Sequence, residues 1–548
     1  MSNSDAFALG IDFGTSTTLI ALPGEPPQVL AIGETERWIP SVLSSGDGEN
    51  WEIGENADAA DVRSQIRSPK SFITHDHFGM ISNDLGVEVD ADEAIAKVLR
   101  VVKEKCKDLG VSTRAPVRMS CPAIWDGNQR KRLAKIATEV GFNVDVDHIM
   151  DEPIAAAVAW WWHKQNTGER LEGNHKALVF DLGGGTLDVA VVDVYSTNDH
   201  PEITVLAARG TKMAGDQLDE DFAVHIENRL LSEKGFKFRG GPQESEIEAW
   251  IRRNARLAKE SLSSMREYSF NPQIPGVEIP ALELTRMELE TVFAPLMAKF
   301  ESCVRATLRE AKLKQSNADI SVIMQEDIQT IGGEVDFVVL AGGMSRIPFI
   351  ETRLAEIMPK ARIGFVSTPE NSTTAIVEGV ANLGEFAGLN VHRPSFNLVI
   401  KWRTPQGVER EECIYSAFQP LYSDDQLNRR ESLLGMDLDF TPGSDSSKGF
   451  HLEIQTVGGK AVSFTVDGRQ TVSIPMTADR NSTIKIKLYM DGKLNIRDAL
   501  GQDLRMRIRE WPVLRWGSTG RKMQPLRIET EITSFNNIST NHWDLNLD

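Results

Sequence analysis

The stretch VFDLGGGTLDVAVV, from Val179 to Val192, contains an apolar strand, a turn with three consecutive glycines and a second apolar strand. Three glycines lose much conformational entropy on folding, so the pattern indicates a turn that something must approach closely. Asp181 and Asp188 flank the turn, and Thr186 follows the last glycine. Backbone N–H groups beside carboxylates suit a phosphate that carries a metal ion. A plain β-hairpin, whose glycines only supply positive φ, is the alternative that this segment alone leaves open.

A second stretch with the same pattern, ALGIDFGTSTTLIAL, lies between Ala8 and Leu22, about 170 positions earlier. Two such hairpins in one chain predict a duplicated domain whose halves face each other across a cleft. Each half then offers one hairpin to a polyphosphate. Because Mg²⁺ keeps most of its waters, we expect Asp12 and Asp181 to hold its water shell from opposite sides.

A third glycine element, FVVLAGGMSRIPFI, runs from Phe337 to Ile350. An apolar strand ends in Gly342 and Gly343, and Arg346 follows just before an expected helix. Bare backbone would let a base or a ribose lie close, with the guanidinium of Arg346 stacked on it. A routine strand-to-helix turn is the alternative. The P-loop, Rossmann, zinc-protease and serine-hydrolase motifs do not occur in the sequence, and neither does the combined HRD–DFG set of protein kinases.

The composition narrows the class of protein. A chain of 548 residues predicts more than one hydrophobic core. Its net charge of −19 argues against binding to nucleic acid. The longest apolar run, Ile154 to Trp162, is far short of the ~20 residues that span a bilayer, so we expect no membrane segment. Four cysteines without a CxxC pair, and an N-terminus without a signal-peptide pattern, predict a cytoplasmic protein without disulfides or zinc.

Taken in order, the three glycine elements resemble the motifs of the actin-like ATPase superfamily and, within it, the seventy-kilodalton heat-shock chaperones of the DnaK type. GIDFGTSTT resembles their first phosphate motif, FDLGGGTLDVAV the second and VVLAGGMSRIP the adenosine motif. The connecting helices of the family resemble MDEPIAAAVAW and STPENSTTAIVEGVANLG. The resemblance covers roughly Ala6 to Phe386. It implies an α/β fold: a duplicated, ribonuclease-H-like ATPase domain of two lobes over residues 1–388, then a mainly β domain over residues 389–548.

The same resemblance implies the site residues. The catalytic residues that it implies are Lys70, Glu152, Asp181, Thr186 and Asp188. Contacts to ATP or ADP fall on residues of the glycine elements and of an adenosine-side helix, namely Gly14, Thr15, Ser16, Thr17, Gly183, Gly184, Gly185, Lys259, Ser263, Gly342, Gly343 and Arg346.

Five residues receive a specific role from the resemblance. Asp12 and Asp181 would orient Mg²⁺ through water, and Asp188 would position the attacking water or a bound K⁺. Lys70, in SPKSFI, matches the lysine that reaches the γ-phosphate, where a cation stabilises charge on the transferring group. Taken by itself, Lys70 would be read as a solvated surface lysine. Glu152 matches the glutamate that senses the γ-phosphate from the opposite lobe.

Two further matches leave alternatives open. Pro122 and Arg130 match the proline and arginine that are proposed to pass nucleotide state to the domain surface. The alternative is that Pro122 only ends a strand and Arg130 is only a charge on a helix surface. In EIEAWIRRNARLAKESLSS the family's glutamate falls on Arg256 and its adenine-stacking arginine on Glu260. Either this exchanged pair still forms a bridge one turn apart, or Arg346 mainly holds the adenine.

Beyond the three elements, two stretches have helical periodicity: ADEAIAKVLRVVKEKCKDL and TVFAPLMAKFESCVRATLREAKL. After Leu389, FHLEIQTV, AVSFTV, STIKIKLYM and LRIETEIT alternate apolar and polar residues, which predicts a β-sandwich. Asp491 and Gly492 predict a hairpin turn there, and the stretch from Leu421 to Gly449 is expected to be a loop. The acidic-leucine linker of the family does not appear, and we expect no helical lid.

The best-supported function is therefore an ATP-hydrolysing chaperone in which nucleotide state controls polypeptide binding by the β domain. The resemblance also implies a J-domain co-chaperone and a nucleotide exchange factor as partners. The alternative is an ATP-gated interaction or scaffold protein with one dedicated partner. A filament-forming relative is disfavoured by the added β domain. A sugar kinase is disfavoured because the match of Lys70 points to water as the acceptor.

Overall fold

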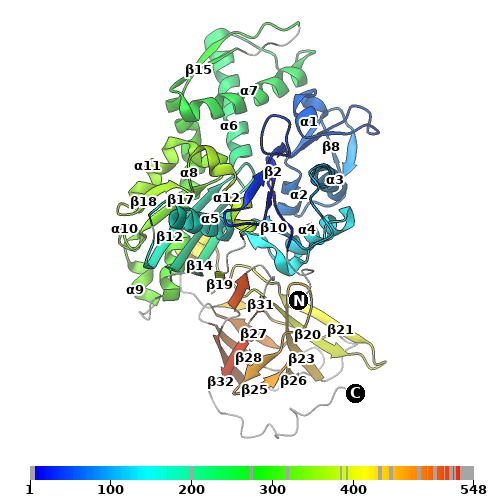
Figure 1. Ribbon diagram of the computed structural model, residues 1–548, viewed down its shortest axis with the longest axis vertical. Helices are drawn as coiled ribbons and strands as arrows, with labels where there is room; N and C mark the ends of the chain where they lie inside the picture. The colour runs from blue at the N-terminus through cyan, green and yellow to red at the C-terminus, as the bar shows by residue number, and fades with distance from the viewer. Residues whose placement is uncertain are drawn as a thin grey trace.

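The computed structural model describes residues 7–530 except 170, 197–200, 272, 274–275, 316–319, 383–385, 391–392, 430–434, 444–448, 478–482, 490–491, 498–502, 511–512, 517–521 and 524–525. Figure 1 shows two α/β lobes side by side, with a smaller β region at one end of the molecule. Within the described ranges, no helix has the length and apolar character needed to cross a membrane.

Lobe I is built on a sheet with the strand order β11-β10-β1-β2-β3. β1 (Leu9–Phe13) and β2 (Thr17–Leu22) form the hairpin predicted near the N-terminus, and all five residues of β1 are buried. On the other side of β1, β10 (Val117–Cys121) runs parallel to it. The other strands of this sheet are β3 (Gln28–Leu30), β4 (Ile39–Pro40), which pairs with β2, and β11 (Met150–Asp151).

Lobe II is built on a sheet that begins with the order β18-β17-β12-β13-β14. Its strands are β12 (Gly173–Leu182), β13 (Leu187–Ser196), β14 (Pro201–Thr211), β17 (Phe337–Ala341) and β18 (Arg362–Phe365). Each sheet has a hairpin, a further antiparallel strand beside its second strand, and two parallel strands beside its first. This strand-by-strand correspondence confirms the predicted duplication.

Lobe I also contains several helices and two small sheets of short strands outside its main sheet. The predicted helix near residue 100 is α3 (Ala91–Asp108), which is capped by Asp90 and buries the apolar face that includes Val98, Leu99 and Val102. The other elements are α1 (Glu55–Ala59), α2 (Lys70–Thr74), α4 (Gly127–Val140), β5 (Val42–Ser44), β6 (Glu52–Ile53), β7 (Gln65–Arg67), β8 (Met80–Ser82) and β9 (Glu88–Asp90).

In lobe II the second predicted helix is α8 (Arg286–Gln315), which packs Phe293 and Phe300 into the largest hydrophobic core. Thr285 and Glu288 form a capping box at its start: the Thr285 amide donates to the Glu288 carboxylate at 2.8 Å, and the Glu288 amide donates to the Thr285 hydroxyl at 3.3 Å. The other elements are α6 (Gly215–Lys234), α7 (Glu244–Ser264), α9 (Ile320–Gln325), α10 (Ile328–Gly332), α11 (Pro348–Ile357), β15 (Glu267–Phe270) and β16 (Leu282–Thr285).

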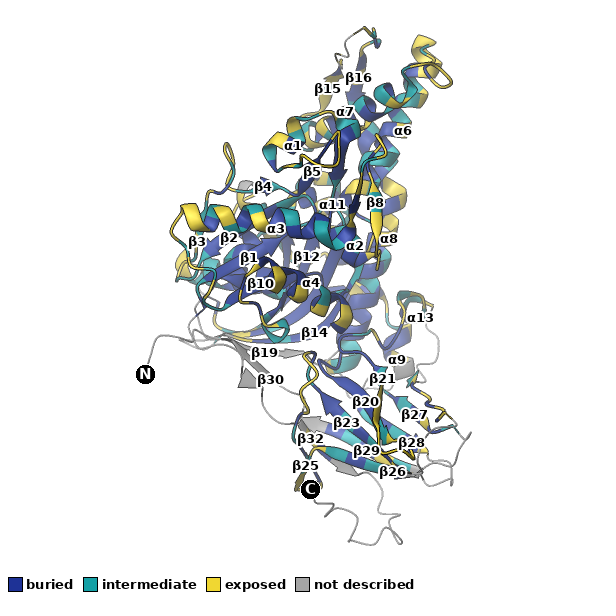
Figure 2. Ribbon diagram, turned by 90° about the vertical axis from the view of Figure 1, so that its right-hand side faces the viewer, coloured by how far each residue is buried: buried dark blue, intermediate teal, exposed yellow. Residues whose placement is uncertain are grey.

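Two helices join the lobes: α5 (Glu152–Asn166) and α12 (Ala375–Val380). They cross at backbone contact, because a Cβ on Gly379 would lie 1.9 Å from the Ala155 carbonyl oxygen. Trp160 and Trp161, which lie within α5, are buried in the hydrophobic core between this helix and the lobe II sheet. Figure 2 shows this buried centre in dark blue, with exposed residues on the outer helices.

The C-terminal region forms the predicted β-sandwich. A four-stranded sheet (β21-β20-β23-β26) and a seven-stranded sheet (β22-β27-β28-β29-β32-β24-β25) share one hydrophobic core. Gly492, in the predicted hairpin turn, has a φ of 82°, and its partner Asp491 lies outside the described residues. The strands are β20 (Asn397–Arg403), β21 (Glu409–Tyr415), β22 (Met436–Asp437), β23 (Gly449–Gln455), β24 (Phe464–Val466), β25 (Arg469–Thr471), β26 (Ser473–Thr477), β27 (Lys485–Leu488), β28 (Lys493–Arg497), β29 (Asp503–Glu510) and β32 (Leu526–Thr530).

The stretch from Leu421 to Gly449 contains a helix that the sequence analysis missed, α13 (Asp424–Asn428). Ser423 and Gln426 form a capping box at its start, and this signal is visible in the sequence. The helix is held against lobe II, where the Asn428 amide donates to the Ser302 carbonyl at 2.9 Å. A short polar segment has little helical propensity of its own, so this tertiary contact is needed to stabilise it.

The sheet of lobe II continues into the C-terminal region. β19 (Phe386–Asn390) pairs in parallel with β14 and antiparallel with β30 (Val513–Trp516), which pairs with β31 (Lys522–Met523). The segment that joins lobe II to the sandwich is therefore a strand with hydrogen-bonded neighbours on both sides. The sequence of β19 lacks the acidic-leucine pattern. The strand can still pair on both edges, because the hydrogen bonds between neighbouring strands are made by backbone groups and not by side chains.

Candidate functional site

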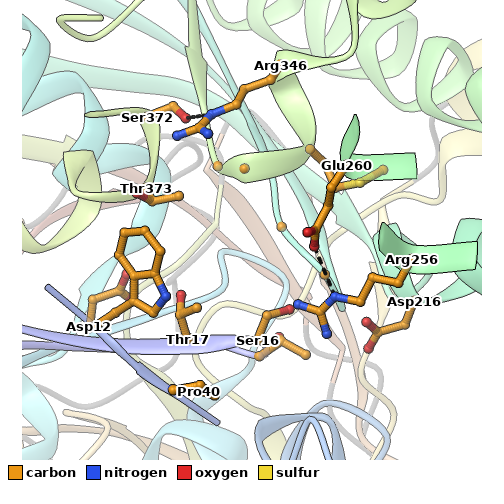
Figure 3. Close-up of a pocket in the computed structure, with 18 of the residues that line it drawn as sticks. Asp12, Ser16, Thr17, Pro40, Asp216, Arg256, Glu260, Arg346, Ser372 and Thr373 are labelled. Carbon is orange, nitrogen blue, oxygen red and sulfur yellow. Dashed lines mark hydrogen bonds and ion pairs between the residues drawn. The ribbon is translucent and has the colours of Figure 1, made fainter. Parts of the chain in front are cut away.

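A cavity of about 630 Å³ lies between the two lobes. Figure 3 shows this cavity in close-up, with side chains from both lobes around it. Most of the site residues expected from the sequence line it: Asp12, Gly14, Thr15, Ser16, Thr17, Lys70, Glu152, Asp181, Gly183, Gly184, Thr186, Lys259, Ser263, Gly342, Gly343 and Arg346. Gly185 and Asp188 are adjacent but do not line it.

The two hairpin turns approach each other closely, which explains the glycines of the second turn. A Cβ on Gly184 would lie 2.2 Å from the Ser16 hydroxyl oxygen, and a Cβ on Gly185 would lie 2.7 Å from the Thr15 methyl carbon. Both turns close in the same way, because the amides of Gly14 and Gly183 donate to the carbonyl three residues ahead, at 3.0 and 3.1 Å. The glycines therefore leave room for the opposite lobe as well as for a ligand.

Asp12 and Asp181 are each the next-to-last residue of the first strand of a hairpin, and both line the cavity. The Ser120 hydroxyl donates to the Asp12 carboxylate at 2.7 Å. Burial raises the pKa of Asp12, although the charge of Lys70 opposes this. Burial and then repulsion from neighbouring carboxylates raise the pKa of Asp181 well above its usual value. The protein therefore neutralises the negative charge of these two carboxylates only in part, and a divalent cation between the lobes fits this donor set.

Lys70 is the first residue of α2 and is buried, so the surface reading of this lysine is wrong. Its ammonium lies 2.5 Å from the Glu152 carboxylate, at the start of α5, and 5.7 Å from the ring centre of Trp125. Burial by itself would lower the pKa of Lys70, but attraction to Glu152 and Asp12 outweighs it and raises this pKa. Burial also raises the pKa of Glu152 to about 8, against the opposing charge of Lys70.

Asp188 lies behind the second turn rather than in the cavity. Its carboxylate accepts a hydrogen bond from the Ala123 amide at 2.6 Å. Burial raises the pKa of Asp188 to about 6, although hydrogen bonds from Thr186 and Ala123 oppose this shift. Thr186 itself lines the cavity, so Asp188 can act on a ligand through this hydroxyl.

At the adenosine end, Gly342 has a φ of 77°, and a Cβ there would lie 2.3 Å from the Leu182 carbonyl oxygen. Only glycine fits this position, so the third glycine element packs its turn directly on the second. Arg346 donates from Nε to the Ser372 hydroxyl at 3.1 Å (Figure 3). The turn therefore faces the cavity with a guanidinium held at its edge.

The helix α7 presents the exchanged pair to the same end of the cavity. Arg256 and Glu260 form an ion pair at 3.1 Å, one turn apart, as the first alternative expects (Figure 3). Lys259 is buried and paired with Asp219 at 2.5 Å, and the Ser263 hydroxyl donates to the Glu260 carbonyl at 2.6 Å. These polar groups all have partners within the protein.

Arg130 is almost fully buried, with 2% of its surface exposed, so the reading as a helix-surface charge is wrong. Its guanidinium pairs with Asp151, the residue before Glu152, and lies 3.9 Å from the ring centre of Phe418 in the C-terminal region. Pro122 is buried at the end of β10. Arg130 therefore contacts both the base of the site and the β-sandwich region.

Several residues around the cavity were not expected from the sequence. Trp38 and Arg67 reach it from lobe I, and Asp216 reaches it from lobe II. The Ser68 hydroxyl donates to the Asp216 carboxylate at 2.8 Å, which joins the lobes across the cleft opening. None of these residues belongs to a glycine motif, so only their positions in the folded chain place them here.

A comparison with protein families agrees with this architecture. The family model described as Hsp70 protein matches residues 8–387 of the chain. The matched range begins just before β1 and ends inside β19. It contains the sheet of lobe I, the lobe II strands from β12 to β18, both connecting helices and the whole cavity between the lobes. The chain belongs to the Hsp70 family.

Proposed function

We propose that the chain hydrolyses ATP to ADP and phosphate in the cavity between its lobes. One observation supports this most directly: two glycine turns, two buried aspartates and a buried lysine from different parts of the chain meet at one cavity. Membership of the Hsp70 family supports the same reaction, because Hsp70 proteins are ATPases. The volume of about 630 Å³ is in the range of small-molecule and cofactor sites.

In this proposal, the backbone of the two turns binds the phosphates, and Asp12 and Asp181 hold Mg²⁺ through water. When bound, Mg²⁺ neutralises charge on the phosphate oxygens. Lys70 adds positive charge beside the γ-phosphate and orients the attacking water. Glu152 holds the Lys70 ammonium in place, and Asp188 holds the Thr186 hydroxyl, with the attacking water or a K⁺ ion nearby.

We further propose that nucleotide state controls polypeptide binding by the β-sandwich, as in a DnaK-like chaperone. Contacts between the site and the sandwich support this. The Gly127 amide donates to the Ala417 carbonyl at 2.9 Å. Arg393 donates to the carbonyls of Ala123 and Phe418, at 2.7 and 3.1 Å. The Ala123 amide also donates to Asp188, so the backbone of one residue contacts both the site and the docked region. J-domain co-chaperones and exchange factors, general partners of the family, belong to this proposal.

The alternative is an ATP-gated scaffold with one dedicated partner. The pairing of β19 on both edges favours it, because a joining strand enclosed between β14 and β30 holds the sandwich in one arrangement. A peptide-array screen of the full chain, with and without ATP, separates the two functions. A chaperone binds many apolar peptides and releases them with ATP, whereas a dedicated scaffold binds none broadly.

A second experiment tests the modular switch. A variant that ends after Asn390 keeps β19 on lobe II but lacks the sandwich. We expect it to hydrolyse ATP at a rate that no longer responds to peptide. Loss of all hydrolysis in the full chain, with intact folding by circular dichroism, would count against the proposed function itself.

A further inference from the structure

Trp38 lies next to the first phosphate turn. It immediately precedes β4, which pairs with β2 through Thr17 opposite Pro40. Just beyond β4, the Ser41 amide donates to the Ser16 carbonyl at 2.8 Å, and the Ser41 hydroxyl donates to the Gly14 carbonyl at 2.9 Å. The backbone that carries Trp38 is therefore fastened to the turn that meets the phosphates.

Trp38 also contacts the connecting helix α12. Its ring is half-buried and packs against a small cluster that includes Val377 of α12 and Ala381, the residue just after this helix. The turn just before α12 contains Ser372, which accepts from Arg346 Nε and whose carbonyl accepts from the Gly342 amide at 3.1 Å. Trp38 thus lies between the phosphate turn and the adenosine turn, and it lines the cavity.

The loop that leads to Trp38 is held in place by its own hydrogen bonds. The Ile32 amide donates to the Arg37 carbonyl at 3.3 Å, and the Glu34 amide donates to the Glu55 carboxylate at 3.0 Å. A Cβ on Gly33 would lie 2.2 Å from the Trp38 carbonyl oxygen, so the loop folds back on itself at this glycine. The position of the indole at the cavity wall follows from these contacts.

The chemistry of the cavity wall explains what this indole can do. Among the described residues that line the cavity, Trp38 is the one aromatic side chain. The charged groups near the adenosine end are already engaged, Arg256 with Glu260 and Lys259 with Asp219. A flat apolar ring beside the two turns offers a stacking surface to a base or a ribose, and such stacking needs no particular base edge.

We infer that Trp38 is a nucleoside-binding residue: its indole packs against the adenosine part of the nucleotide from lobe I. This inference rests on the proposed function, because it assumes that ATP and ADP bind in this cavity. It answers the question raised by Glu260, which stands where a stacking arginine is expected. Trp38 supplies from lobe I the flat surface that α7 does not.

The test compares two ligands that differ only in the base. Affinities of the full chain for ADP and for ribose 5-diphosphate are measured with Mg²⁺ by competition against a fluorescent nucleotide. Trp38→Leu keeps an apolar side chain against Val377 but removes the ring. We expect it to weaken ADP binding between about fivefold and 150-fold, while ribose 5-diphosphate binding changes much less. Trp38→Phe keeps a ring and should recover most of the affinity for ADP.

Trp51→Leu is the matched control. Trp51 is also in lobe I, but its Nε1 donates to the Gly48 carbonyl at 3.0 Å and the residue does not line the cavity. ADP affinity should stay within about twofold of wild type. The inference is overturned if Trp38→Leu leaves ADP binding unchanged, weakens both ligands equally, or is not rescued by Trp38→Phe. A wild-type chain that does not bind ADP overturns the proposed function together with the inference.

Discussion

The Lys70 ammonium lies 2.5 Å from the Glu152 carboxylate, and both side chains are more than nine-tenths buried. Lys70 comes from a short helix of lobe I, whereas Glu152 begins the helix that connects the lobes. An ion pair taken out of water is costly unless function or further contacts compensate. Its position on the wall of the cavity makes a functional reason the natural one.

Lys70→Ala should lower ATP turnover at least about a hundredfold, because it removes the cation that stabilises charge on the transferring phosphate. ADP affinity should change only a few-fold, since ADP lacks the γ-phosphate. Single-turnover hydrolysis and ADP titration measure the two effects separately. Lys135→Ala, at an exposed position on α4, is the control. Equal loss of turnover and affinity would contradict a catalytic role for Lys70.

The nucleotide-free chain should lose stability as pH rises from about 4.5 to about 8. The pKa of Glu152 is raised from 4.5 to about 8, so the folded chain holds a proton that the unfolded chain releases in this window. This contribution is complete below pH 4.5 and is lost as pH passes through about 8. Glu152→Gln should flatten the dependence of Tm on pH by roughly several degrees. Glu139→Gln, at an exposed site, should not; a Tm profile unchanged by Glu152→Gln would refute the shift.

Gly184→Ala should weaken ATP binding by about tenfold or more, because its Cβ would lie 2.2 Å from the Ser16 hydroxyl oxygen of the opposite lobe. The Ser16 Cβ lies at 3.6 Å from the same point, so Ser16→Ala removes the close contact. The double variant should therefore bind ATP more tightly than the two single effects predict. Calorimetric titration of all four proteins gives this coupling. Strictly additive losses would mean that the turns do not meet in solution.

Phe418→Ala should weaken the link between the site and the β-sandwich. The ring of Phe418 stacks on the buried Arg130 guanidinium, a contact worth about 0.5–2 kcal/mol. We expect basal ATP turnover to stay within about twofold, while its response to added apolar peptide falls. Val408→Ala, at an exposed position of the same region, should leave both quantities unchanged. A full peptide response in Phe418→Ala would exclude this contact from the coupling.

The duplicated sheets could be predicted because each hairpin has a sequence pattern that is complete within a short segment. Apolar strands, glycine turns and flanking aspartates occur within about fifteen residues, and the same pattern occurs twice. The long helices and the alternating strands of the sandwich are also local signals. The small helix α13 was missed because its stability depends on a contact with Ser302, more than a hundred residues away.

The burial of Arg130 and Lys70 could not be read from their neighbours in the chain. Both are long charged side chains, which are mostly exposed in proteins, and only the packing of α2, α4 and α5 around them removes the solvent. Trp38 was missed for a related reason: its loop has no motif, and its place in the cavity wall depends on which elements meet there.

By itself the sequence determined the local chemistry: which turns carry bare backbone, which strands end in aspartate, and that the halves of the N-terminal region are copies. Only the tertiary structure decided which groups share one space, namely that the two turns touch, that Lys70 meets Glu152 and that the sandwich contacts Arg130. The physical reason is that strand and turn propensities act over a few residues. Burial, pKa shifts and contacts between lobes arise from groups that the chain separates by tens to hundreds of positions.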